Sequence, residues 1–252
     1  LTEGIDSNLM LFVMLFAFVI LLVAGAYLIQ QLQGRTWRMV VNGTQRVRWS
    51  HFFGGFAVWG VINLVSMAVG YVTDPGNFEF RFDAARFIPL VLVAVTMIPI
   101  QSASEEFFFR GYLAQGVASW TGSRWWALVV PSVLFGLMHA ANPEVAQYGF
   151  WVMMPQYILM GVAFGLAALL DDGIEVAVGA HAANNLCGAL LTTYEGAAIQ
   201  TDALFMVREL NPMADLPELI LSGALFVGLL AYLYKWQFGV LRQPVPPPFK
   251  YA

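Results

Sequence analysis

Charged residues are scarce in this chain. Only 11% of its 252 residues are Asp, Glu, Lys or Arg, whereas soluble domains of this length carry about a quarter. Hydrophobic residues account for 59% of the chain. The net charge of −4 is small and dispersed, so nothing indicates a nucleic-acid partner. The composition therefore predicts an integral protein of the lipid bilayer, with an all-α fold built as a polytopic transmembrane helical bundle.

The sequence lacks the residues that several known types of catalytic site require. A single cysteine, Cys187, excludes a disulfide within the chain and argues against a thiolate metal centre. There is no His-Glu-x-x-His zinc signature, and Ser104 has no evident base beside it. The candidate pair for an aspartyl protease, Asp171 and Asp172, is adjacent in sequence at a span boundary. We expect neither metal nor cofactor, although glutamate and histidine side chains together can hold a metal ion.

Long apolar runs are present instead, and seven of them can cross a bilayer. They cover residues 9–30, 52–72, 87–118, 125–141, 150–170, 174–192 and 216–238. The third run fits one tilted helix or two shorter ones, because Pro89 and Pro99 can kink or break it. Seven spans are therefore expected, or eight if that run divides. No linker or repeat splits the chain, so residues 1–252 are expected to form a single membrane domain.

Loop charges predict an orientation in the membrane. The loop 31–51 holds four arginines and no acid, whereas the loop 193–215 is mostly acidic. With seven spans, the positive-inside rule places the C-terminus in the cytoplasm, and the expected location is a bacterial inner membrane. His51 is expected at the membrane interface, and Asp171, Asp172 and Glu175 in an interfacial loop.

The N-terminal run is expected to be a spanning helix. It is too long for the core of a cleaved signal peptide, and acidic rather than basic residues precede it. Because the chain begins with Leu1 rather than Met, further sequence is expected before it.

A few strongly polar side chains nevertheless fall inside the apolar runs. They are Glu105, Glu106, Arg110, His139, His181 and Asn185. A charge at the centre of a bilayer costs roughly 2.5–3.5 kcal/mol on insertion scales, and unpaired polar groups there are also costly. The energy is lowest if these side chains meet inside the bundle. Polar clusters can serve packing alone, at about 0.6 kcal/mol per contact, but six such groups from three spans favour a functional site.

Helix geometry separates the two carboxylates. Glu106 and Arg110 are four residues apart on one face, which is the spacing of an ion pair. Glu105 points about 140° away from Arg110 and has no cation on its own helix. A nearby imidazole could share its proton, so the pair could act as general base and acid on a water molecule. His181 and Asn185, also four apart, could donate hydrogen bonds to an oxyanion.

Three short motifs carry a family resemblance. They are Glu105-Glu106-x-x-x-Arg110, Phe135-x-x-x-His139 and His181-x-x-x-Asn185. In this order, within a polytopic chain, they resemble the signature motifs of the CAAX protease and bacteriocin-processing (CPBP) family. This family is also called the glutamic intramembrane protease or type II CAAX prenyl endopeptidase group. The resemblance covers about residues 86–192, which would form the catalytic core.

The resemblance implies a role for each matched residue. Glu105 would be the general base that activates water, working with His139. His181 and Asn185 would form the oxyanion hole, and Phe135 would pack beside His139 and limit the access of water.

The same resemblance implies a metal-independent intramembrane endopeptidase, in which Glu106 and Arg110 support the site. The expected substrate is a membrane-anchored or membrane-inserted peptide or protein, and the residues leave open whether it is prenylated. Family members are also thought to act as scaffolds. The alternative is therefore a catalytically silent assembly subunit, with other membrane protein subunits as partners.

Overall fold

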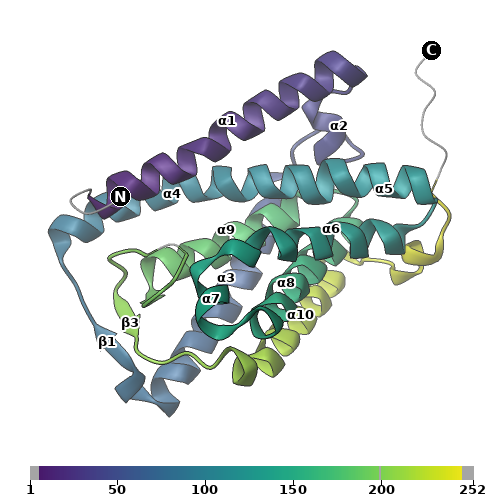
Figure 1. Ribbon diagram of the computed structural model, residues 1–252. Helices are drawn as coiled ribbons and strands as arrows, with labels where there is room; N and C mark the ends of the chain where they lie inside the picture. The colour runs from purple at the N-terminus through teal and green to yellow at the C-terminus, as the bar shows by residue number, and fades with distance from the viewer. Residues whose placement is uncertain (1–5, 199, 246–252) are drawn as a thin grey trace.

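Helices dominate the computed structural model, which describes residues 6–198 and 200–245 (Figure 1). The α-helices are α1 (Ser7–Gln33), α2 (Trp37–Val41), α3 (Trp49–Thr73), α4 (Ala84–Glu106), α5 (Ala114–Thr121), α6 (Arg124–Met138), α7 (Pro143–Tyr148), α8 (Phe150–Asp171), α9 (Glu175–Leu190) and α10 (Pro212–Tyr234). Three short strands, β1 (Phe78–Phe80), β2 (Thr192–Tyr194) and β3 (Phe205–Val207), form a sheet in the order β1-β3-β2. The predicted all-α polytopic bundle is confirmed, with this small sheet added to it.

Short non-α helices complete the chain. The 3-10 turns are η1 (Pro75–Asn77), η3 (His139–Ala141) and η4 (Phe238–Arg242), and η2 (Phe107–Leu113) is a π-helical segment. Together α4, η2 and α5 make one long rod, and α1 lies along it (Figure 1). Pro89 and Pro99 lie inside α4 without ending it, so the third predicted run is one continuous stretch rather than two.

Six helical stretches among the described residues are long and apolar enough to cross a membrane. They are Ser7–Gln33, Trp49–Thr73, Ala84–Thr121, Arg124–Ala141, Phe150–Asp171 and Pro212–Tyr234. They support an integral membrane protein, but the expected count of seven or eight spans is not confirmed. The difference lies in run 174–192, where α9 has only 16 residues. At 1.5 Å per residue it is about 24 Å long, short of the roughly 30 Å hydrocarbon core.

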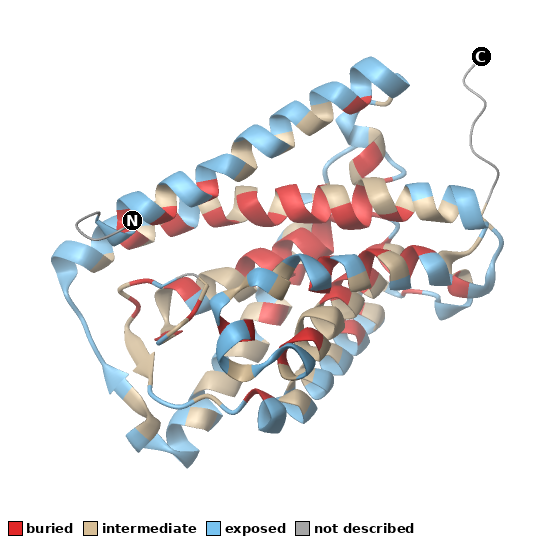
Figure 2. Cartoon of the chain, viewed as in Figure 1, coloured by how far each residue is buried: buried red, intermediate tan, exposed pale blue. Residues whose placement is uncertain are grey.

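Instead of facing lipid, α9 lies in the middle of the bundle. Its residues from Glu175 to Ala183 are all buried, and it packs against both α3 and α4 (Figure 2). Glycines allow the close approach to α3. A Cβ on Gly179 would lie 1.9 Å from the Phe52 carbonyl oxygen, and one on Gly55 would lie 2.1 Å from the Val176 carbonyl oxygen. The short central helix is thus held backbone against backbone.

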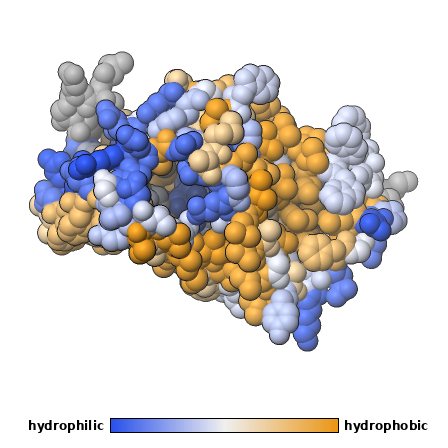
Figure 3. All heavy atoms as spheres, turned by 90° about the horizontal axis from the view of Figure 1, so that it is seen from below, coloured by the Kyte–Doolittle hydropathy of each residue, from blue (hydrophilic) through white to orange (hydrophobic). Residues whose placement is uncertain are grey.

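The outer helices show the opposite burial pattern. Large apolar side chains on α1 are exposed, with Val13 at 61% and Val23 at 65%. An exposed apolar surface of this extent suits contact with lipid. From below, hydrophobic residues cover much of the molecule, and hydrophilic residues gather around a hollow toward one end (Figure 3). The C-terminal residues 246–252, to which the orientation prediction applies, lie outside the described part of the chain.

Candidate active site

A cavity of about 660 Å³ lies between α1, α4, α6, α8 and α9. Its walls include Glu105, His139, His181 and Asn185. The structure therefore brings together the four residues proposed for catalysis, from three separate helical regions. Glu105 lies in the last turn of α4, His139 directly follows α6, and the other two lie one turn apart on α9.

Glu106 and Arg110 form a buried ion pair behind this cavity. Arg110 Nη1 lies 2.9 Å from Glu106 Oε1, and both side chains are at most 2% exposed. The Arg110 guanidinium also donates to the Gly161 carbonyl at 3.3 Å and lies 4.2 Å from the centre of the Phe135 ring. The ion pair expected from the four-residue spacing is therefore present, and it takes Arg110 away from Glu105.

His181 is oriented by the same carboxylate. Its Nδ1 lies 2.7 Å from Glu106 Oε1, so this nitrogen must carry a proton, because a carboxylate oxygen only accepts. Its Nε2 lies 3.7 Å from Glu105 Oε2, which is longer than a hydrogen bond. One oxygen atom of Glu106 thus fixes both Arg110 and the imidazole.

Glu105 keeps one carboxylate oxygen uncommitted. Its Oε1 accepts a hydrogen bond from Gln101 Nε2 at 2.7 Å. Its Oε2 is buried and has no hydrogen-bond partner among the described residues. A buried acceptor without a partner is unfavourable unless a water or a ligand completes it. Glu105 lines the cavity, so a water or substrate atom there is the expected partner of this oxygen.

His139 is held by its own helix and by aromatic neighbours. Its Nδ1 donates to the Phe135 carbonyl at 2.7 Å, so Nε2 is the ring nitrogen left for other contacts. The ring stacks on Tyr157 at 4.6 Å between centroids and lies 4.7 Å from the Phe135 ring. The plane of the imidazole is therefore fixed at the cavity wall.

Gln101 was not among the residues predicted from the sequence. Its side chain bridges two candidates, since Nε2 donates to Glu105 and Oε1 accepts from Asn185 Nδ2 at 3.0 Å. Asn184 Nδ2 in turn donates to Asn185 Oδ1 at 3.1 Å. The available signal was the four-residue spacing from Gln101 to Glu105 inside an apolar run.

A second missed group lies just after His139. Tyr157 donates its hydroxyl hydrogen to Glu144 Oε1 at 2.6 Å, and Asn142 Nδ2 lies 3.2 Å from the Tyr157 oxygen. All three residues line the cavity. The sequence places Asn142 and Glu144 on either side of Pro143, a pattern typical of an exposed turn, yet Glu144 is only 5% exposed.

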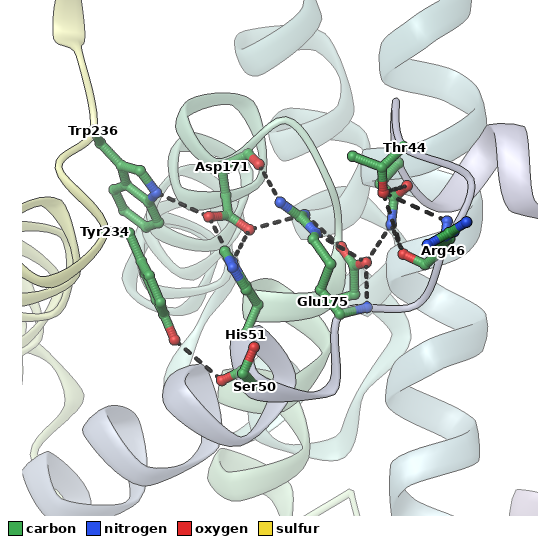
Figure 4. A network of polar contacts seen from close by, with 10 residues as sticks. Thr44, Arg46, Ser50, His51, Asp171, Glu175, Tyr234 and Trp236 are labelled. Atoms are coloured by element: carbon green, nitrogen blue, oxygen red, sulfur yellow. Dashed lines mark hydrogen bonds and ion pairs between the residues drawn. The ribbon is translucent and has the colours of Figure 1, made fainter.

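Another polar network, away from the cavity, buries two acids that were expected in an exposed loop at the interface. Asp171 and Glu175 are 6% and 4% exposed, not surface loop residues. Arg48 Nη2 lies 2.9 Å from Asp171 Oδ2 and 2.6 Å from Glu175 Oε2, while Trp236 Nε1 and His51 Nδ1 also contact Asp171 (Figure 4). His51 is thus partly buried and takes part in this network.

This network ties the first turn of α9 to the start of α3. Burial alone would lower the pKa of the Arg48 guanidinium, but its hydrogen bond to Glu175 and the charge of Asp171 outweigh burial and raise that pKa. Arg48 therefore stays charged and cross-links both acids. Because α9 carries His181 and Asn185, the network sets the position of half of the candidate site.

Comparisons with known proteins agree with the motifs. Residues 85–187 match the family model described as type II CAAX prenyl endopeptidase Rce1-like. The chain is also 29% identical, over 203 residues, to a Bacillus subtilis (strain 168) protein named "Uncharacterized protein YyaK"; this match covers 80% of the present chain and 68% of YyaK. No solved structure matches the chain. The resemblance expected from the motifs is thereby confirmed: residues 85–187 of this integral membrane protein are similar to the Rce1-like type II CAAX prenyl endopeptidase family.

Proposed function

We propose that this protein is a glutamic intramembrane endopeptidase that hydrolyses a peptide bond with a water molecule activated by Glu105. The observation that carries the proposal is the free Oε2 of Glu105, buried in the wall of a cavity that His139 and His181 also line. A desolvated carboxylate beside imidazoles is a suitable general base at neutral pH.

The proposed reaction is a direct hydrolysis. Glu105 takes a proton from water as the water oxygen bonds to the substrate carbonyl carbon. The carbonyl oxygen becomes an oxyanion, which His181 Nε2, when protonated, and the second amide hydrogen of Asn185 stabilise. Breaking the carbon–nitrogen bond requires a proton on the amine, which Glu105 returns, assisted by His139. One product gains the hydroxyl of water and the other its hydrogen.

Glu106 and Arg110 act as positioning residues in this scheme. Neither is among the residues that line the cavity, and the two pair with each other behind it. Glu106 accepts from His181 Nδ1 and so sets the direction in which Nε2 points. Arg110 neutralises the Glu106 carboxylate, which would otherwise be a buried, uncompensated charge.

The substrate class follows from the cavity walls. One side consists of apolar side chains from α1: Leu11, Met14, Leu15 and Phe18. Such a wall suits a membrane-inserted or lipid-anchored peptide or protein better than a soluble one. Location in a bacterial inner membrane with a cytoplasmic C-terminus completes the proposal.

Reconstitution tests this function and its metal independence. We expect the purified protein in liposomes to cleave at least one member of a set of membrane-inserted reporter peptides, and cleavage to continue after treatment with EDTA and 1,10-phenanthroline. Product masses from mass spectrometry would identify the bond. Loss of cleavage with chelator and its return on adding zinc would replace the glutamic mechanism with a metal-dependent one. Nothing in the described structure favours the scaffold alternative.

Gln101 gives a test of site positioning. Gln101→Leu keeps the volume but removes the hydrogen bonds to Glu105 and Asn185, so kcat should fall about tenfold or more while KM changes little. The control is Thr96→Val on the same helix, whose hydroxyl bonds only to its own backbone and whose loss should leave kcat unchanged. An equal effect of both variants, or an effect on KM alone, would contradict the positioning role.

A further inference from the structure

The candidate cavity has an acidic character. Its described lining residues include two carboxylates, Glu105 and Glu144, and no lysine or arginine. Arg110, which lies close behind the cavity, is paired with Glu106 and is not a lining residue. The cavity therefore offers no fixed positive charge to a substrate and two negative ones.

Glu144 takes no part in the hydrolysis proposed above, yet it is unusually placed. It is 5% exposed, and the hydrogen bonds it receives from Tyr157 and Asn142, at 2.6 and 3.5 Å, both go to Oε1. Its Oε2 is buried without a hydrogen-bond partner among the described residues. Tyr157 and Asn142 thus both hold Oε1 of Glu144. The other oxygen, Oε2, remains available to a bound ligand or substrate.

This free oxygen lies close to a residue that is proposed to take part in catalysis. Tyr157, which donates to Glu144, stacks directly on the His139 ring. A substrate group that reached Glu144 would therefore lie near His139 rather than at a remote surface.

We propose that Glu144 is a specificity residue whose free oxygen receives a cationic side chain, lysine or arginine, next to the peptide bond that is cut. This inference rests on the proposed function and names the substrate class for the same cavity. A buried carboxylate with an unfilled acceptor is stabilised by an ammonium or guanidinium group. The α1 wall of the cavity is apolar, so the preferred substrate is an apolar membrane segment that carries one basic residue.

The same charges act against an anionic substrate group. An acidic side chain of a substrate at this position would be repelled by the two carboxylates, and no described lysine or arginine lines the cavity to pair with it.

Peptide binding can be measured without cleavage. The binding arm uses the Glu105→Gln protein in detergent and fluorescent membrane peptides of one apolar sequence, with lysine, norleucine or glutamate at a single position that is moved along the peptide. We expect at least one lysine peptide to bind about tenfold tighter than its norleucine counterpart, and the glutamate peptide to bind more weakly. Adding Glu144→Gln should abolish the preference for lysine, whereas adding Glu209→Gln, an exposed loop carboxylate, should preserve it.

A zero-length carbodiimide cross-link locates the contact without altering Glu144. The lysine peptide should become joined to Glu144, as identified by mass spectrometry, which keeps the test valid if the Glu144→Gln variant fails to fold. Equal binding of the lysine and norleucine peptides, no binding of any peptide, or a cross-link to other carboxylates only would overturn the inference.

The cleavage arm separates this inference from the proposed function. If the unmodified protein cuts none of the peptides but the lysine preference in binding persists, the proposed function fails and the cationic subsite stands. If the protein cuts lysine and norleucine peptides at the same rate and binds them equally, hydrolysis stands and the subsite fails.

Discussion

Glu105→Gln is expected to lower the rate of peptide cleavage by a factor of about 10² to 10⁴, the usual contribution of a general base. Glutamine has nearly the same shape as glutamate, and its carbonyl oxygen can still accept the hydrogen bond from Gln101 Nε2. What it loses is the ability to take a proton from water. The change should therefore appear in kcat, with little change in the thermal unfolding temperature.

The measurement is the rate of product formation in liposomes, at equal amounts of folded protein judged by size-exclusion chromatography. Glu209→Gln serves as the matched control, because it removes one carboxylate from an exposed loop position and should leave the rate unchanged. If the Glu105→Gln protein retained more than about one tenth of the wild-type rate, Glu105 could not be the general base.

Arg110→Met is expected to reduce stability rather than chemistry alone. The guanidinium is 2% exposed and compensates the fully buried Glu106 carboxylate. Removing one partner of a buried ion pair typically costs about 3–5 kcal/mol, which is a large part of the stability of a small protein. We expect little monodisperse protein after detergent extraction and a strongly lowered unfolding temperature.

The double variant Glu106→Gln/Arg110→Met separates the two roles of this pair. Removing both charges is often neutral for stability, so folded protein should accumulate again. Activity should stay low, because glutamine at position 106 holds His181 Nδ1 less firmly than a carboxylate does. Wild-type stability of the single Arg110→Met protein would show that the pair does not hold the core together.

The motif residues were predictable because burial in an apolar chain makes polar side chains conspicuous. The Glu106–Arg110 pair followed from helical spacing alone, and the structure contains it. The link between Gln101 and Asn185 could not be foreseen in the same way, since the two residues are 84 positions apart in sequence. Only the packing of α9 against α4 brings them within hydrogen-bond distance.

The number of spans could not be predicted from the apolar runs alone. Run 174–192 is hydrophobic enough to lie in lipid, but hydropathy does not distinguish a lipid-facing helix from one buried in protein. Its alanines and glycines were the relevant signal, because small residues let helices pack closely. Asp171 and Glu175 were misassigned for a related reason: their partners Arg48 and Trp236 come from distant segments.

The glycine contact between α3 and α9 has a consequence for how a peptide enters. With the carbonyl groups of Phe52 and Val176 occupying the space that side chains would need on the opposite helix, neither backbone can slide or turn without collision. The part of α9 that leads to His181 and Asn185 is accordingly packed tightly against α3. Under the proposed function, widening of the cavity would therefore fall to the opposite wall, where α1 contributes apolar side chains, and a substrate would enter from the lipid side.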